Sequence, residues 1–573
     1  NAISLGNLYT SKLSLKPNRI LGSGNIKGLN YAYSMQRING LVENLTEQNV
    51  KLLTPKDLLN ELTYIKLNYA NAFDYSGLKQ NILPKLHRID EDGTYLEEIL
   101  PNQENMYLDI LNELKIQQID IEKSAVNQIT GQIVIKNTNN LNITNLSIDG
   151  MDSNITNIIT RDGKTYINLT ATPIYYYDTY KISKIKYKID ETEYEETVEG
   201  KFEQQFYKEL YNFEDWQSID KDDGLYQNYR LMNDIDFTGK INVNSNVTMA
   251  RLESVGEKKT LKNINLKFEN VQETGLIKKI TNNIKNIKFE NIEIQASNDA
   301  NGIGIISNCS AEISNLEFKN ITINSKTNTI GCIANIVQTS VKNIKVEDVN
   351  VVGNQYVGGL VGQYDAPMYT LSDVIADDVD VNGSSSVGGI VGSSSINSNL
   401  IRITINNSNI KGQTQVGGIV GYRRSTTGPY GMQDIKAENN EIRGINAVGG
   451  IGGNINRLSN VISRRNLIFG TVNVGGIGGI AGGTSDNLYS IENDVIAESV
   501  DAKYIGGISG LGENYLSNLG VVKCNIKSLG NCVGGIFGHT NASTQNNISR
   551  TFIKDTNIEG KDNVAGIIGI CMA

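Results

Sequence analysis

A hydrophobic element recurs at near-constant spacing through the C-terminal half of the chain. Its clearest copies consist of Val-Gly-Gly, then Leu or Ile, then Val-Gly, and they begin at Val357, Val387 and Val416. Weaker copies extend the series back to Thr274 and forward to Val564, with a mean spacing of about 29 residues. This period is typical of repeat proteins, in which each unit buries its apolar side chains only by stacking on its neighbours.

Within each repeat, two further stretches alternate apolar and polar residues, which is the pattern of β-strands. Val341–Val346 is followed by Val349–Val351 in one repeat, and Leu400–Ile405 by Ile410 in a later one. Polar loops of variable length separate these stretches from the glycine-rich element, and no stretch has the length and spacing of a helix. We therefore predict a mainly β fold with three short strands per repeat, a parallel β-solenoid of about 29 residues per coil over residues 241–573.

Stacked coils would place valine on valine and isoleucine on isoleucine. Their backbones would pair about 4.8 Å apart, which gives a rod on the order of 50 Å long. The paired glycines, such as Gly388 and Gly389, allow a tight turn or a close approach of neighbouring backbones. A phosphate-binding loop is excluded, because it needs a strand, a glycine loop and a helix in succession.

Two further regions are predicted at the N-terminal end. Residues 1–125 are expected to form a mixed α/β region with a helix over Thr54–Ile65, because Thr54 is a good cap and Pro55 suits the first helical position. Residues 126–202 alternate with period two between Asn-rich and Asp-Gly turns. They predict a small antiparallel β-sandwich, with strands at 131–136, 166–172 and 181–187.

Residues 203–240 are predicted to form a helical cap and an entry strand for the solenoid. Phe206, Leu210 and Phe213 have helical spacing and predict a helix over 203–219. Tyr229–Phe237 is expected to be the strand that enters the array. A helix in this place would cover the exposed end of the stack, where unpaired strand edges invite unwanted pairing.

Composition excludes several classes of protein. The chain is 39% hydrophobic and 20% charged, as expected of a globular protein. A net charge of −9 and a pI near 5.2 leave no basic stripe for nucleic acid, and no stretch approaches the roughly 20 apolar residues of a membrane-spanning helix. Five cysteines without a Cys-x-x-Cys pair exclude a zinc ribbon and a disulfide scaffold. They are expected to be small buried thiols, and we expect no metal and no cofactor.

No catalytic constellation is recognisable in the sequence. The best candidates are Asp377, Asp378 and Asp380, and strand alternation would put Asp378 and Asp380 on one face, about 7 Å apart. Hydrolysis of a polysaccharide requires two carboxylates about 5–9.5 Å apart in a cleft. A solvated acidic stripe is the favoured interpretation, and no catalytic residue is assigned.

The longest interruption of the repeats, around residues 422–432, is the best candidate for ligand contact. Tyr422, Arg423, Arg424 and Tyr430 would place two guanidinium groups and two aromatic rings on a projecting loop. Such side chains are common anchors of interfaces, and binding residues favour loops on rigid scaffolds. A plain surface loop is the alternative.

A second arginine pair, Arg464 and Arg465, falls one repeat later at a similar phase. We expect it to stack on Arg423 and Arg424, which would give a basic patch on an otherwise acidic protein.

The Val-Gly-Gly-Ile-Val-Gly element resembles the GLUG repeat of bacterial surface proteins, over about 300 residues of the chain. The order of segments is also similar to the N-terminal region of streptococcal zinc metallopeptidases that cut IgA1. This order is a small β domain, then Phe213–Ile219, then Tyr229–Phe237, and then a solenoid. In those proteins the solenoid precedes the protease and is thought to engage substrate or partners. Their His-Glu-x-x-His motif has no counterpart here, because neither His87 nor His539 is followed by Glu.

These observations predict an extracellular or cell-surface binding scaffold of a bacterium, without enzymatic activity in this chain. Its partner would be a host glycoprotein, a polysaccharide or another bacterial surface protein. The alternatives are the non-catalytic N-terminal part of a zinc metallopeptidase, a receptor-binding component of a toxin or phage tail, and a polysaccharide-degrading β-helix. The chain begins without Met or a signal-peptide pattern, so we expect it to be a piece of a longer protein.

Overall fold

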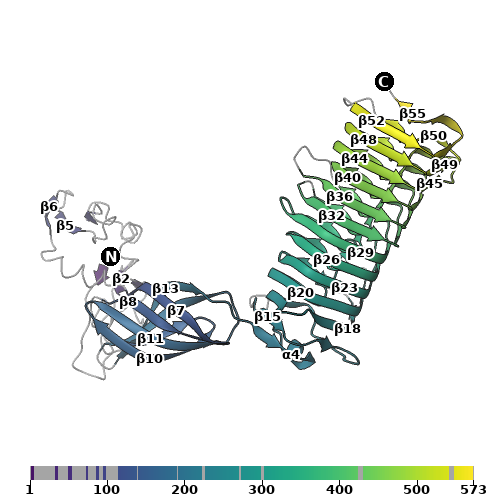
Figure 1. Cartoon of the computed structure of the whole chain (residues 1–573). Helices are drawn as coiled ribbons and strands as arrows, with labels where there is room; N and C mark the ends of the chain where they lie inside the picture. The colour runs from purple at the N-terminus through teal and green to yellow at the C-terminus, as the bar shows by residue number, and fades with distance from the viewer. Residues whose placement is uncertain are drawn as a thin grey trace. The chain divides into compact units, whose positions relative to one another are not determined.

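The computed structural model describes residues 114–571 except for 138–139, 190–191, 222–225, 270–272, 298–301, 396, 424–429 and 541–546. Ahead of residue 114 it describes β1 (Ala2–Ser4), β2 (Ala32–Met35), β3 (Val50–Leu53), β4 (Phe73–Asp74), β5 (Lys85–Ile89) and β6 (Tyr95–Glu98). The helix predicted over Thr54–Ile65 lies outside the described residues. The chain forms two compact units, Asn1–Phe206 and Tyr207–Ala573 (Figure 1).

The first unit contains two antiparallel sheets that share one hydrophobic core. One sheet has the order β10-β11-β8-β7 and the other β13-β12-β9. The strands are β7 (Lys115–Ala125), β8 (Gln128–Lys136), β9 (Asn142–Ile148), β10 (Met151–Arg161), β11 (Lys164–Pro173), β12 (Thr179–Ile189) and β13 (Thr192–Glu203). Ile133 and Ile167 of one sheet and Leu146 and Ile185 of the other are buried in the core between them. The three predicted strands are confirmed within β8, β11 and β12, but β7 joins this unit from the region assigned to residues 1–125.

The helix predicted over 203–219 is wrong for most of its length. Helical structure is confined to α4 (Phe213–Gln217), and a strand, β14 (Lys208–Leu210), precedes it. Phe206, Leu210 and Phe213 have helical spacing, yet Phe206 packs into the core of the first unit and Leu210 into that of the second. The periodicity is therefore produced by residues that serve two separate cores.

Helix α4 covers the first coil of the solenoid, as a cap was expected to do. Its Trp216 is fully buried, donates a hydrogen bond from Nε1 to the Asn244 carbonyl at 2.8 Å, and meets the Phe237 ring edge-on. Asn212 and Asp215 form a capping box at the helix start. The predicted entry strand is two short strands, β15 (Asn228–Leu231) and β16 (Ile235–Asp236), and the parallel ladder begins at β14, ahead of residue 241.

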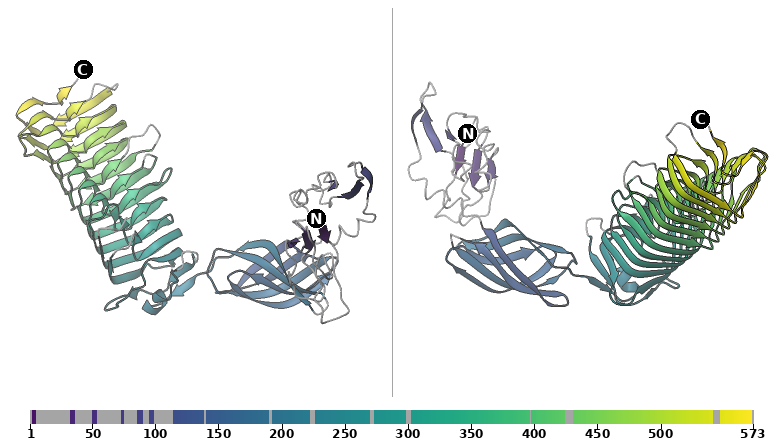
Figure 2. Two further views of the ribbon diagram at one scale, coloured as in Figure 1. Left: turned by 180° about the vertical axis from the view of Figure 1, so that it is seen from behind. Right: turned by 45° about the horizontal axis from the view of Figure 1, so that its top comes forward.

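The second unit is a parallel β-solenoid of about 11 turns and roughly 29 residues per coil, as predicted (Figures 1 and 2). After the first strands β17 (Val247–Ser254) and β18 (Lys259–Phe268), one glycine-rich strand per coil forms an 11-stranded sheet. Its members are β19 (Glu273–Thr274), β21 (Gly302–Ile303), β24 (Ile330–Gly331), β27 (Gln355–Gly358), β30 (Ser385–Gly388), β34 (Thr414–Gly417), β38 (Asn446–Gly449), β42 (Val472–Gly475), β46 (Lys503–Gly506), β50 (Asn531–Gly534) and β54 (Asp562–Ala565).

From β21 onward, a second strand follows each of these after a bend, whereas β19 leads directly into the long strand β20. This set is β22 (Ile306–Cys309), β25 (Ala334–Val337), β28 (Val361–Tyr364), β31 (Val391–Ser394), β35 (Val420–Arg423), β39 (Gly452–Asn456), β43 (Gly478–Gly482), β47 (Ser509–Gly512), β51 (Phe537–Thr540) and β55 (Ile568–Cys571).

The rest of each coil is one long bent strand in the early coils and two strands in the later ones. The long strands are β20 (Ile277–Ala296), β23 (Glu312–Asn324), β26 (Val341–Val352) and β29 (Thr370–Asn382). The pairs are β32 (Asn399–Asn406) and β33 (Asn409–Lys411), β36 (Met432–Glu438) and β37 (Glu441–Arg443), β40 (Leu458–Arg464) and β41 (Leu467–Phe469), β44 (Thr484–Ile491) and β45 (Asp494–Ala497), β48 (Tyr515–Val522) and β49 (Asn525–Ser528), and β52 (Asn547–Lys554) and β53 (Asn557–Glu559).

The glycine-rich element therefore supplies two strands rather than the one that was predicted, and close approach explains its glycines. A Cβ atom on Gly388 would lie 2.1 Å from the carbonyl oxygen of Val391 across the bend. On Gly389 it would lie 2.2 Å from the carbonyl oxygen of Gly418 in the next coil. Neither glycine has a positive φ, so the space available, not backbone conformation, excludes a side chain.

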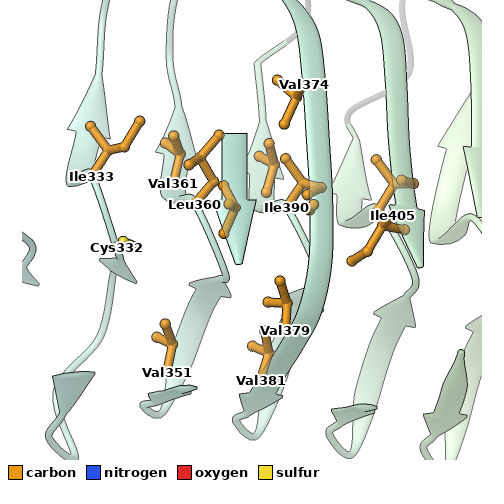
Figure 3. Packing of buried hydrophobic residues seen from close by; sticks show 14 of the residues in the cluster. Cys332, Ile333, Val351, Leu360, Val361, Val374, Val379, Val381, Ile390 and Ile405 are labelled. Carbon is orange, nitrogen blue, oxygen red and sulfur yellow. The ribbon is translucent and has the colours of Figure 1, made fainter. Parts of the chain in front are cut away.

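Side chains of one type stack in the interior from coil to coil. Ile333, Leu360 and Ile390 occupy equivalent positions, are fully buried, and lie one above the other with Val351 and Val381 across the core (Figure 3). Their backbones are joined as well, since the Leu360 amide donates to the Ile390 carbonyl at 3.0 Å. Four cysteines are buried as expected, at Cys309, Cys332, Cys524 and Cys532.

A ladder of buried asparagines closes one bend of the later coils. The Asn440 amide donates to Asn466 Oδ1 at 2.8 Å, and the Asn466 amide donates to Asn493 Oδ1 at 2.8 Å. The Asn466 side chain also donates from Nδ2 to the Ala437 carbonyl at 2.9 Å. Each side chain thus satisfies backbone groups that the bend would otherwise leave buried without partners.

We predict that Gly389→Ala locally loosens the stack, because the added methyl group overlaps backbone of the next coil. Overpacking of this kind costs about 1–3 kcal/mol, and it should appear as faster hydrogen exchange in peptides spanning 385–394 and 414–423. Gly566→Ala is the matched control, because Gly566 occupies the same repeat position and has nothing within 4 Å of the place that a methyl group would take. Equal exchange in both variants would contradict this account of the glycines.

We predict that Asn466→Ala is strongly destabilising. It leaves the Asn440 amide and the Ala437 carbonyl without these partners, at a cost of about 1–3 kcal/mol for each buried group left unpaired. Asn525→Ala, on the solvent side of β49, should cost much less. Denaturant unfolding followed by hydrogen exchange of β36 and β40 measures both effects, and similar losses in the two variants would argue against a structural role for the ladder.

Candidate binding surface

Loops of variable length gather at one edge of the solenoid, between the second and third strand of each coil. Residues 365–369 connect β28 to β29, residues 395–398 connect β31 to β32, and residues 424–431 connect β35 to β36. These connections belong to consecutive coils and lie one after another along the stack. We call the described residues of these three connections the loop ridge.

Hydrogen bonds between the connections extend the solenoid ladder into the loop ridge. The Met368 amide donates to the Asn397 carbonyl at 2.6 Å, and the Asn399 amide donates to the Tyr369 carbonyl at 3.0 Å. The Gly431 amide then donates to Asn399 Oδ1 at 3.1 Å. The three connections are therefore held in register with one another.

The loop ridge exposes two large apolar side chains side by side in the sequence. Met368 is 75% exposed and Tyr369 is 46% exposed. Met368 also has a φ of 69°, a conformation that costs free energy for a residue other than glycine. The prediction from sequence missed this pair, although Met-Tyr after Ala366-Pro367 is the one apolar interruption of an otherwise polar connection.

The predicted contact residues are only partly where they were expected. Tyr422 lies on β35, half-buried between Ser393 and Asn454 of the neighbouring coils. Tyr430 lies at the end of the third connection and is half-buried. Arg424 lies outside the described residues.

Arg423 was predicted as a surface contact and is instead 1% exposed, inside the coil. Its Nη2 donates to the Ser398 carbonyl at 2.8 Å and its Nη1 donates to Ser394 Oγ at 3.4 Å. Burial, followed by the positive charge of Arg457, lowers the pKa of the Arg423 guanidinium to about 10, so it is charged at neutral pH. No carboxylate among the described residues forms an ion pair with it, and its hydrogen bonds tie β35 to the second connection of the loop ridge.

The basic patch predicted from Arg464 and Arg465 does not form with Arg423. The in-register neighbour of Tyr422 is Asn454, whereas Arg464 pairs with Glu438 at the end of a different strand. Arg465 donates to Glu438, and Arg464 lies within 3.5 Å of Glu492. The two arginines therefore neutralise acidic side chains at another bend.

The three candidate aspartates, Asp377, Asp378 and Asp380, lie on β29 at the surface. Asp378 and Asp380 are exposed on either side of buried Val379, as strand alternation requires, although Asp378 has a φ of 56°. Burial and then the charges of Asp348, Asp380 and Asp377 raise the pKa of Asp378. Within the described residues no group of three or more His, Cys, Asp or Glu side chains is placed to hold a metal ion. None of the described helices is long and apolar enough to cross a membrane.

We predict that Arg423→Met loosens the loop ridge without unfolding the solenoid. The change removes a hydrogen bond from a charged donor, which is worth about 1.5–3 kcal/mol. Amide exchange in residues 395–400 should accelerate. Arg402→Met is the matched control, since Arg402 forms an exposed ion pair with Asp373 at 2.5 Å and should leave that exchange unchanged. Unaltered exchange in Arg423→Met would contradict a bracing role.

Comparison of the chain with family models, with curated proteins and with solved structures finds no match.

Proposed function

We propose that this chain is an extracellular binding scaffold of a bacterium, either an adhesin or the recognition region of a larger surface protein. In this proposal the chain has no catalytic role of its own. Its partner is a host glycoprotein, a polysaccharide or another bacterial surface protein.

The observation that carries the proposal is the pair of exposed side chains on the loop ridge. A solvent-exposed Met beside an exposed Tyr has no structural use in the coil below it, and both types are enriched at protein interfaces. Their backbone is held by hydrogen bonds to the next coil, where Asn397 lies in the second connection. That connection is held in turn by Arg423, which donates to the Ser398 carbonyl. Holding contact residues in place before binding reduces the conformational entropy lost on binding.

The apolar character of the pair favours a protein surface as the partner at this ridge. Met is adaptable in shape and Tyr combines an apolar ring with a hydroxyl group. Neither carries charge, so recognition would depend on burial of apolar surface and on shape rather than on ion pairs.

The main alternative is the non-catalytic N-terminal part of a zinc metallopeptidase. The sequence resemblance that suggests it rests on Phe213–Ile219 and Tyr229–Phe237, the segments that form α4, β15 and β16. In both cases the solenoid is a recognition element, and the identity of the partner separates them.

We predict that the double variant Met368→Ser/Tyr369→Ser loses binding by about 10–100-fold, as expected when interface anchors are truncated. The full chain would be tested by biolayer interferometry against immobilised IgA1, mucin-type glycoproteins and bacterial polysaccharides. Binding to IgA1 would favour the metallopeptidase alternative. Binding to mucin-type glycoproteins or polysaccharide without IgA1 would favour an adhesin.

The matched control is Val500→Ser/Leu529→Ser, which removes two exposed apolar side chains from a different edge of the solenoid. It should bind as the unaltered chain does. If the unaltered chain binds no probe, or if both double variants lose binding equally, the assignment of the loop ridge as the contact surface is wrong.

A further inference from the structure

The outer face of the third strand changes its chemistry along the solenoid. In the early coils one line of in-register positions holds Lys288, Glu317 and Lys345, and these side chains take part in ion pairs with their neighbours. In the last coils the same line continues through Ile462, Tyr489, Gly520 and Phe552. The adjacent outward line holds Ile491 and Val522, and then Lys554 in the coil of Phe552.

Two aromatic rings meet over Gly520 on this face. A Cβ atom on Gly520 would lie 2.7 Å from Tyr489 Cδ1 and 2.7 Å from Phe552 Cζ. The ring centroids of Tyr489 and Phe552 are 6.4 Å apart, and the ring planes are inclined by 51°. Phe552 is 47% exposed, so the rings cover the glycine from one side and face solvent on the other. We call Tyr489, Gly520 and Phe552 the aromatic shelf.

The side of the shelf toward the start of the strand is polar and carries one acidic side chain, Asp486, in the nearest line of in-register positions. Ser517 and Ser549 occupy consecutive coils in one outward line, and Tyr515 and Asn547 occupy the next line. Tyr515, Asn547 and Ser549 are exposed. Hydroxyl and amide groups thus lie beside the rings together with the Asp486 carboxylate. In earlier coils the line of Ser517 and Ser549 holds Lys285 and Lys342.

The combination of stacked apolar rings and neutral hydroxyl and amide groups matches the surface of a pyranose sugar, which has an apolar C–H face and a rim of hydroxyl groups. A stable protein partner needs about 800 Å² of surface on each side. Two partly exposed rings and two aliphatic side chains offer much less, since a whole aromatic side chain buries only about 150–250 Å².

We propose that the aromatic shelf binds a neutral saccharide, with a pyranose ring stacked on Tyr489 and Phe552 and its hydroxyl groups bonded to Ser517, Ser549 and Asn547. This site is separate from the loop ridge and does not depend on it. Met368 and Tyr369 belong to the coil that is four coils before Tyr489, about 19 Å along the axis.

The test uses the full chain on an array of neutral and sialylated oligosaccharides, followed by isothermal titration calorimetry with the neutral oligosaccharide that binds best. Tyr489→Ser and Phe552→Ser should each weaken binding about tenfold or more, the range expected for loss of one stacked ring. Gly520→Ala should weaken binding as well, because it keeps both rings but forces them apart. Ile375→Ser is the matched control, since Ile375 is an exposed apolar residue in the same line of positions, and it should leave binding unchanged.

Thermal unfolding of each variant separates a binding effect from a structural one. Variants that lose saccharide binding with an unchanged melting temperature support the proposal. If no neutral oligosaccharide binds the unaltered chain, or if Tyr489→Ser and Phe552→Ser bind as tightly as Ile375→Ser, the shelf only fills the space over Gly520 and the proposal is wrong. The loop-ridge variant Met368→Ser/Tyr369→Ser should keep saccharide binding, so failure at one surface is distinguishable from failure at the other.

Discussion

In-register stacking of each coil on the next is the constraint on which the second unit depends. Parallel pairing places every residue about 4.8 Å from its equivalent in the neighbouring coil, so the chemistry of one position must suit the same position above and below it. Inside, this favours the unbroken Val357, Val387 and Val416 column. Outside, it allows Lys319 to meet Glu347 and Arg402 to meet Asp373. A set of in-register positions therefore faces either the interior or the solvent over many consecutive coils.

The bends show how the same constraint limits the sequence. The second residue of the glycine pair is Leu276, Ile305 and Cys332 in the early coils, where it is a buried side chain. From Gly359 to Gly535 it is glycine, and a Cβ there would meet the carbonyl oxygen of the next coil at 2.1–2.3 Å. Other bends use residues with positive φ, such as Asn343 and Asp348 within β26. Asn and Asp adopt this conformation more readily than most residues, which accounts for part of the asparagine in the chain.

The sequence was sufficient for the period, the parallel solenoid and the strands of the first unit, because alternation and self-similarity act over many residues. It was not sufficient where one or a few residues determine the position of a bend, the end of an element or the burial of a side chain. Phe206, Leu210 and Phe213 have the spacing of a helix, but Phe206 and Leu210 are buried in two different cores. The glycine pair lies at a bend that the pattern did not indicate, so the one predicted strand is two strands. At the candidate site, Arg423 was predicted to be a surface anchor because the sequence places it beside a long loop. The sequence does not indicate that its side chain points into the coil, where it is buried. Met368 and Tyr369 were missed because their connection is short.

A solenoid can change its outer columns without disturbing its core, and this separates the two proposed surfaces. The loop ridge is apolar and preorganised, whereas the aromatic shelf combines rings with neutral hydroxyl and amide groups. Both are built on the same stack of coils, so a partner that carries a polypeptide surface and a neutral glycan a short distance apart would engage both at once. The second contact would then form at a high effective concentration, and the two weak interactions together would bind far more tightly than either alone. Of the three proposed classes of partner, a host glycoprotein has both kinds of surface on one molecule.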